Sequence, residues 1–148
     1  MNNRDRQMAV EAAQSFVGTP FRYHFKPDIC GQGLATKSEC MRVGMDDKGM
    51  DCSGLVIASV CRVLHMDPNE WNPDYRHFAQ IRRKEDLSAL WQLGDAVTFS
   101  SDHLGIYSGE GKFIHASGVN KVVEETELTD PYNVFGVIPL ETLFRLSA

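Results

Sequence analysis

Residues 51–64 read DCSGLVIASVCRVL and indicate a helix that is apolar on nearly all sides, as expected at the buried centre of a small domain. Asp51 precedes the apolar run, where its carboxylate can cap the first turn. Cys52 then lies at the positive end of the helix dipole, which favours the thiolate. The small Ser53 and Gly54 leave room for a substrate, and N–H groups there can stabilise an oxyanion. The stretch predicts a cysteine nucleophile, the alternative being that Cys52 is a small buried hydrophobic residue.

Composition limits the class of protein. The chain has 148 residues, with 15 Lys plus Arg, 20 Asp plus Glu and 43% hydrophobic residues, and we expect one globular domain over residues 1–148. The net charge of −5 and the absence of a cationic run argue against a nucleic-acid or anionic-membrane binder. No apolar run is long enough for a secretory leader or a membrane span, so we expect a cytoplasmic protein with no membrane insertion.

The four cysteines do not follow a metal-binding pattern. They form no CxxC pair, and no histidine stands at zinc-finger spacing from them. Cys30 and Cys40 could pair as a disulfide if the protein meets an oxidising compartment. We therefore expect neither a structural metal nor a cofactor.

Apolar periodicity predicts helices first and strands afterwards. Helical spacing covers residues 4–16 and ends at Gly18-Thr19-Pro20, and residues 22–50 form a long irregular loop without a sustained period. Two short helices are expected between residues 67 and 90. Alternating or β-rich segments then occupy residues 96–100, 103–108, 112–116, 121–125 and 134–140. This order predicts an α+β fold with a mostly antiparallel sheet of about five strands.

Two histidines, His103 and His115, flank a turn at residues 108–111. Opposed residues of an antiparallel hairpin have a constant index sum, and the two histidines share a face only if that sum is even. A three-residue loop centred on Gly109 gives 218 and sets them directly opposite each other, whereas a two-residue loop at Gly109-Glu110 sends them to opposite faces. The glycine-containing turn is compatible with the three-residue loop. We predict adjacent imidazoles, the alternative being two unrelated strand histidines.

In this arrangement His103 abstracts the thiol proton, while His115 contacts the other ring nitrogen of His103 and fixes its tautomer.

Other titratable residues are expected to have structural roles. His24, His65 and His77 stand in loops or at a helix end, where solvated or capping roles are typical. The acidic stretch at residues 124–127 is interpreted as a solvated strand end.

Five sequence blocks, taken together, resemble the NlpC-type cysteine peptidases, which cut bacterial cell-wall peptides. In chain order the blocks are GTPFRY at 18–23, DCSGLV at 51–56, LGDAVTF at 93–99, HLGIY at 103–107 and FIHAS at 113–117. The resemblance spans about residues 8 to 140, which is nearly the whole chain.

The resemblance implies a papain-like α+β fold, with the nucleophile at the start of a central helix that packs on the histidine-bearing sheet. It implies Cys52 as the nucleophile, His103 as the general base and acid, and His115 as the residue that orients His103. The implied partner is a peptidoglycan stem peptide or muropeptide fragment, cut between γ-D-glutamate and a diamino acid without a metal.

The chain departs from the family pattern at the sites that would contact substrate. Phe21 stands where the family often has the tyrosine of the oxyanion hole, so Tyr23 is the substitute that we consider. The long stretch 22–50 is expected to shape or cap the cleft. Arg76 is the candidate in a region where relatives carry a substrate-contacting Arg-Ser pair. Asp51 is the carboxylate best placed for a substrate amine, with helix capping as its alternative role.

Two other functions stay open on the sequence alone. One is an acyltransferase or a different amidase on the same fold, because cleft shape and water access select the acceptor. The other is a catalytically inactive binding module. A peptidoglycan enzyme without a leader is expected either to recycle fragments in the cytoplasm or to reach the cell wall through a phage or a dedicated export system.

Overall fold

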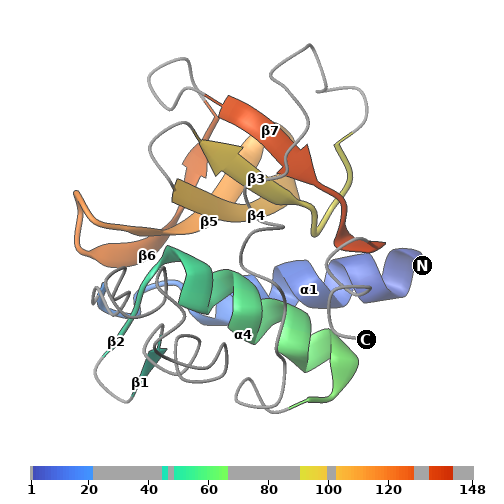
Figure 1. Cartoon of the computed structure of the whole chain (residues 1–148), viewed down its shortest axis with the longest axis horizontal. Coiled ribbons are helices and arrows are strands. Elements are labelled where there is room, and N and C mark those ends of the chain that lie inside the picture. The colour runs from blue at the N-terminus through green and yellow to red at the C-terminus, as the bar shows by residue number, and fades with distance from the viewer. Residues whose placement is uncertain are drawn as a thin grey trace, which may run out of the picture.

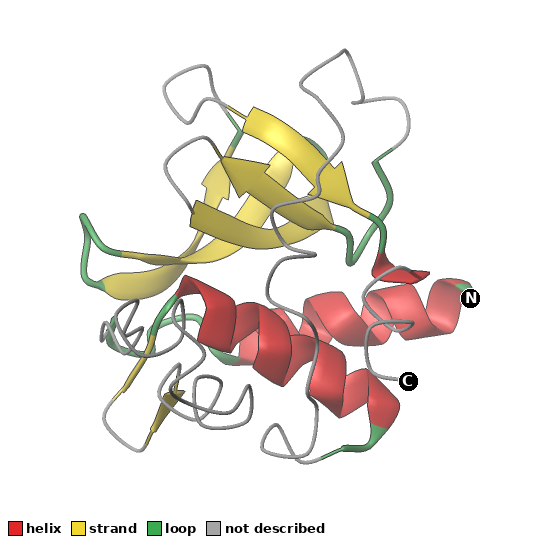
Figure 2. Cartoon of the chain, in the orientation of Figure 1, coloured by secondary structure: helices red, strands yellow, loops and turns green. Residues whose placement is uncertain are grey.

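The computed structural model describes residues 2–21, 45–46, 49–66, 91–99, 103–128 and 134–141. Within these ranges two long helices lie along one face of a five-stranded antiparallel sheet (Figures 1 and 2). The α+β class predicted from the sequence is confirmed. The predicted short helices between residues 67 and 90 lie outside the described residues.

Helix α1, Asn3–Ser15, begins at Asn2, whose side chain accepts a hydrogen bond of 2.9 Å from the Asp5 N–H. This bond satisfies one of the N–H groups that a helix start leaves without a partner. The helix ends close to the predicted place, and Gly18 follows with a φ of +93°, a backbone conformation that glycine adopts without strain. The buried face of α1 consists mainly of alanines, which allows a close approach to the second helix.

Helix α4, Cys52–Leu64, is the predicted central helix. Leu55, Val56 and Val60 are fully buried against α1 and the sheet. His65 caps the C-terminal end in the left-handed conformation, with a φ of 55°, and Met66 N–H donates to the Cys61 carbonyl at 3.0 Å. The capping role expected of His65 is confirmed. None of the helices in the described part of the chain is long and apolar enough to cross a membrane.

The sheet has the strand order β6-β5-β4-β3-β7, and every neighbouring pair is antiparallel. The strands are β3 Ala96–Phe99, β4 His103–Gly109, β5 Lys112–Ser117, β6 Val122–Glu127 and β7 Val134–Ile138. Strands β3 to β6 follow the chain as a meander, and β7 returns to pair with the free side of β3 (Figure 1). All five predicted strands are confirmed to within about two residues at each end.

The two faces of the sheet bury different residues. Leu104, Ile106 and Ile114 belong to the large core formed with α1 and α4. The alternate residues of the same strands point to the opposite face, where Phe99 and Phe113 anchor a smaller cluster. By the same alternation, the residues of β4 and β5 that carry imidazoles lie on this second face.

The segment before α4 is not wholly irregular. Strands β1, Met45–Asp46, and β2, Gly49–Met50, pair antiparallel within the stretch predicted as a loop. The prediction was wrong there because two-residue strands are too short to show a period of two in the sequence. The other residues of 22–50 lie outside the described part of the chain.

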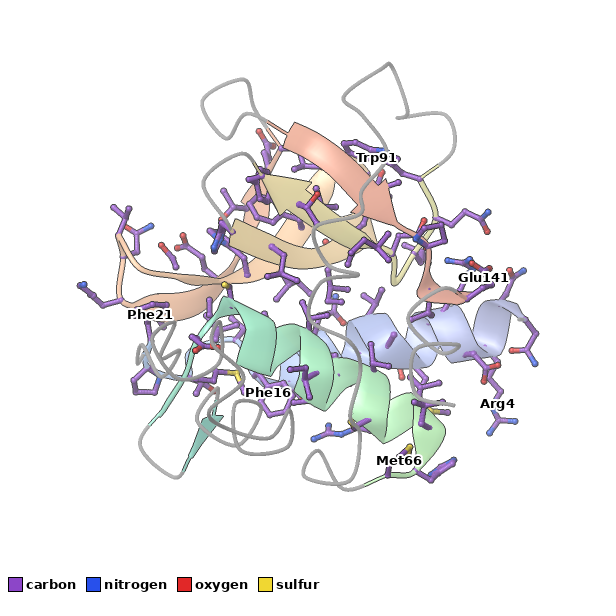
Figure 3. The ribbon with its side chains drawn as sticks, viewed as in Figure 1. Arg4, Phe16, Phe21, Met66, Trp91 and Glu141 are labelled. Atoms are coloured by element: carbon purple, nitrogen blue, oxygen red, sulfur yellow. The ribbon has the colours of Figure 1, made fainter. Side chains whose placement is uncertain are left out.

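A buried ion pair joins α1 to the sheet. Arg6 of α1 donates to Asp95 Oδ1 at 2.7 Å and to the Leu93 carbonyl at 2.9 Å. It also pairs with Glu141, which lies beside α1 in Figure 3. The Asp95 carboxylate also accepts from Leu140 N–H at 2.9 Å. The hydrogen bonds around the buried pair of Arg6 and Asp95 offset its desolvation, and they hold α1, the start of β3 and residues 140–141 together.

Candidate active site

Cys52 is the first residue of α4, and Asp51 caps that end of the helix. The Asp51 carboxylate is 2% exposed and accepts the Gly54 N–H at 2.8 Å, while its backbone carbonyl accepts the Leu55 N–H at 3.0 Å. The predicted capping role is confirmed, and the predicted contact with a substrate amine stays a prediction. Cys52 is partly exposed at this positive helix end, where the dipole favours its thiolate.

Short bridges tie the residues before Cys52 to one end of the sheet. Met50 N–H donates to the Pro20 carbonyl at 3.1 Å, and Pro20 forms an antiparallel bridge with Val122 at the start of β6. Val122 pairs with Ser117, the last residue of β5. This sheet end is therefore the one toward which the N terminus of α4 is directed (Figure 1).

His103 begins β4 at the same end of the sheet. In the register of the β4–β5 pair, where Ile106 faces Ile114, His103 comes opposite Ser117. One continuous chain of pairing, from Met50 through Pro20 and β6 to β5 and β4, thus brings the start of β4 and the start of α4 to one edge. The cysteine and the first histidine, far apart in sequence, share this edge of the fold.

The two histidines form a direct pair. His103 Nε2 lies 2.6 Å from His115 Nδ1, and the ring planes meet at 76° with their centroids 4.9 Å apart. His115 is 2% exposed, whereas His103 is partly exposed. The prediction that both imidazoles lie side by side on one face is confirmed.

The predicted hairpin geometry was wrong, although its result holds. Gly109 pairs with Lys112, so the loop has two residues, Glu110 and Gly111, and both have a positive φ as a type I′ turn requires. A bulge between Tyr107 and Gly109 then changes the index sum from 221 to 220. Because this sum is even, both histidines lie on one face of the sheet. His115 is two residues away from the position directly opposite His103.

Gly105 provides the space between them. In the observed register Gly105 comes opposite His115. A Cβ atom on Gly105 would lie 2.6 Å from the Ile114 carbonyl oxygen, closer than such atoms approach in proteins, and 3.0 Å from His115 Cβ, which is tighter than most Cβ contacts. A glycine at this position is therefore needed for β4 and β5 to hold the two rings in contact.

Burial keeps the pair neutral. Burial, with a smaller contribution from the nearby His115, lowers the pKa of His103 to about 4. Burial also lowers the pKa of His115, although Glu124 acts in the opposite direction. At neutral pH His103 is thus an unprotonated imidazole, the state in which it can accept a proton from a thiol.

Sequence reasoning missed two residues of the site on β6. His115 Nε2 lies 3.4 Å from Glu124 Oε1 and 3.4 Å from Thr126 Oγ1. Glu124 pairs directly with His115 across the β5–β6 ladder. The stretch 124–127 is therefore more than a solvated strand end. The loop between Ser117 and Val122 has four residues, so the numbers of paired residues in β5 and β6 add up to 239, and His115 pairs with Glu124. Assuming a loop of this length would have predicted the contact from the sequence.

The remaining predicted residues are divided between described and undescribed parts of the chain. Ser53 lies in the first turn of α4, next to Cys52 in the sequence. Tyr23 and Arg76 lie outside the described residues, as do Cys30 and Cys40. Within the described ranges, no group of three or more His, Cys, Asp and Glu side chains is arranged to hold a metal ion.

The model of the NlpC/P60 family matches residues 40–134 of the chain. Among curated proteins, the probable endopeptidase NlpC of Escherichia coli is 30% identical over 126 residues, covering 80% of this chain and 66% of that protein. The probable endopeptidase YafL of E. coli is 32% identical over 94 residues, covering 58% and 36%. The murein DD-endopeptidase MepH of E. coli is 33% identical over 93 residues, covering 57% and 32%. This chain spans between about a third and two thirds of the length of these relatives.

Solved structures share the fold. The peptidoglycan hydrolase RipB of Mycobacterium tuberculosis superposes with a TM-score of 0.60 at 22% identity, covering 95% of this chain and 68% of that one. RipD of the same organism, described as a non-catalytic domain adapted to peptidoglycan binding, gives a TM-score of 0.60 at 13% identity, covering 93% and 98%. Because catalytic and non-catalytic proteins share this fold, the side chains decide which class a chain falls into.

Proposed function

The chain belongs to the NlpC/P60 family, and from this premise we propose that it is a cysteine endopeptidase that hydrolyses an amide bond in peptidoglycan stem peptides. The observation that carries the proposal is the contact of 2.6 Å between His103 Nε2 and His115 Nδ1, at the sheet end toward which α4 directs Cys52. A base with an orienting partner beside a cysteine at a helix N terminus is the arrangement that nucleophilic catalysis needs.

Acylation is the first chemical step. His103 takes the proton of Cys52, and the thiolate sulfur forms a bond to the carbonyl carbon of the scissile amide, whose π electrons move to the oxygen. The tetrahedral oxyanion collapses, His103 returns the proton to the leaving nitrogen, and the C–N bond breaks to release an amine. The product on the enzyme is a thioester of Cys52.

Deacylation repeats the sequence with water. His103 removes a proton from water as the hydroxide oxygen adds to the thioester carbonyl, and the C–S bond then breaks. The acyl group leaves as a carboxylic acid, which ionises, and the proton on His103 returns to Cys52. If an amine or an alcohol replaced water here, the same site would act as an acyltransferase.

We propose the bond between γ-D-glutamate and the diamino acid as the site of cleavage. The motif resemblance supports this bond, whereas the relative described as the probable endopeptidase NlpC supports only an endopeptidase in general. Tyr23, Asp51, Ser53 and Arg76 remain the candidates for substrate contacts, with Tyr23 and Arg76 outside the described residues.

Mass spectrometry of defined substrates tests the proposal. L-Ala-γ-D-Glu-diaminopimelate and a muropeptide digest are incubated in H₂¹⁸O with the wild type and with Cys52→Ala. We expect the wild type alone to release diaminopimelate and L-Ala-γ-D-Glu that carries one ¹⁸O in its new carboxylate. Cleavage that persists in Cys52→Ala would contradict the proposal, and transfer of the acyl group to an added amine would support the acyltransferase.

A non-catalytic role would have a different signature. In an inactive binding module, substitution of His103 has no reason to change the reactivity of the Cys52 thiol. If His103→Ala leaves the rate of Cys52 alkylation unchanged at neutral pH and no substrate is cut, the binding module becomes the better explanation.

A further inference from the structure

We propose that Glu124 is a positioning residue that fixes the proton positions on both active-site histidines. The inference rests on the proposed function, since it assigns Glu124 a task in that same site. Glu124 lies on β6, one strand beyond His115 and two beyond His103. His115 contacts both His103 and Glu124, so the side chains of three neighbouring strands are linked through it.

The contacts of His115 determine which of its nitrogens carries the proton. Its Nε2 faces two oxygens, Glu124 Oε1 and Thr126 Oγ1, each at 3.4 Å. An ionised carboxylate only accepts hydrogen bonds, so the Nε2 that faces it must be the protonated nitrogen. In a neutral His115 the Nδ1 atom then carries a lone pair.

The tautomer of His115 determines the tautomer of His103. The lone pair of His115 Nδ1 needs a donor, and His103 Nε2, at 2.6 Å, is the atom that faces it. His103 therefore carries its proton on Nε2, which leaves Nδ1 with the lone pair. Nδ1 is thus the atom of His103 that can remove the thiol proton, and the opposite tautomer would have no base to offer.

A turn residue holds the Glu124 carboxylate in place. Asn120 Nδ2 lies 2.8 Å and 3.0 Å from the two Glu124 oxygens, so it donates to the carboxylate. Asn120 is itself anchored, because its N–H donates to Ser117 Oγ at 3.0 Å. The amide is neutral, so it orients the carboxylate without cancelling the charge. A freely solvated surface glutamate would have no such support.

The test replaces the acceptor with groups of different hydrogen-bonding character. Glu124→Gln introduces an amide that can accept or donate, and Glu124→Lys introduces a group that only donates. Glu125→Gln and Glu125→Lys make the same changes of charge at the next residue, whose side chain is exposed on the other side of the strand. They control for the net charge and for the stability of β6.

Nitrogen chemical shifts of the imidazoles, measured by NMR at about pH 8, report the tautomers without substrate. We expect His103 and His115 to be protonated on Nε2 in the wild type and in both Glu125 variants. In Glu124→Lys we expect protonated Nδ1 to appear on both rings. Unchanged tautomers in a folded Glu124→Lys protein would overturn the inference. If the lysine variant does not fold, the kcat of Glu124→Gln decides.

Activity provides the second measurement. We expect Glu124→Gln to lower kcat about tenfold, the effect of weakening one hydrogen bond to a charged group, with KM changed less than about twofold. The Glu125 variants should keep the wild-type kcat. An unchanged kcat in Glu124→Gln would count against the role. If the tautomers shift while even the wild type fails to cut stem peptides, the proposed substrate is wrong and the role of Glu124 stands.

Discussion

Acidification should destabilise this fold through His103, by an amount that follows from its burial. The pKa of His103 is about 4 in the folded chain and 6.5 in the unfolded chain. Between these values the unfolded state binds more protons, so the free energy of unfolding falls as the pH is lowered from about 6.5 to 4. The difference of 2.5 pH units corresponds to at most about 3 kcal/mol, since each unit is about 1.4 kcal/mol.

A difference between two variants isolates this term. Urea unfolding is followed between about pH 7 and pH 4 for Cys52→Ala and for the double variant Cys52→Ala with His103→Gln. Cys52→Ala removes the thiolate, which would otherwise raise the pKa of His103. Titrations of groups remote from His103 contribute to both proteins and largely cancel.

We expect the single variant to lose about 2 to 3 kcal/mol more than the double variant over this range. The neutral glutamine has no proton to take up, so its protein should be less sensitive to acid. Equal losses in both proteins would show that His103 titrates in the folded chain as it does in the unfolded chain, contrary to this prediction.

Three further predictions follow from the site and its support. Gly105→Ala should push the β5 backbone away, lower kcat at least tenfold and cost about 1 to 3 kcal/mol of stability, as measured by steady-state kinetics and urea unfolding. Asp95→Ala should cost about 3 to 5 kcal/mol in thermal or urea unfolding, because it leaves the buried Arg6 without its main partner; a loss below about 1 kcal/mol would contradict this. His115→Ala should keep measurable turnover of a stem tripeptide while Cys52→Ala keeps none, and equal loss in both would give His115 a more direct role.

The central helix could be predicted because its signals are local. A continuous apolar stretch of helical length, with Asp51 before it, allows few alternatives, and the structure begins α4 at the expected residue. The strands were predictable for the same reason, since each shows its own alternation between turns. The pair Met45–Asp46 and Gly49–Met50 was not, because its pairing depends on contacts and is too short to leave a pattern.

The sequence predicted that the two histidines share a face of the sheet, but not the hairpin geometry that places them there. Parity decides whether two strand residues share a face, but parity depends on every residue of the hairpin. The bulge before Gly109 adds one residue to β4, and it offsets the two-residue loop. No feature of the sequence distinguishes this combination from a three-residue loop. The contact of Glu124 with His115 needed the register of a second hairpin and was missed for the same reason.

This geometry should activate the Cys52 thiol, and the pH dependence of its alkylation measures that activation. The rate of iodoacetamide modification at Cys52 is followed by peptide mass spectrometry in the wild type and in His103→Ala. We predict a wild-type apparent pKa below the ordinary thiol value of about 8.5, because Cys52 begins α4, and faster modification at neutral pH than in His103→Ala, because the neutral imidazole can accept the thiol proton. Coincident profiles near 8.5 in both proteins would contradict the account.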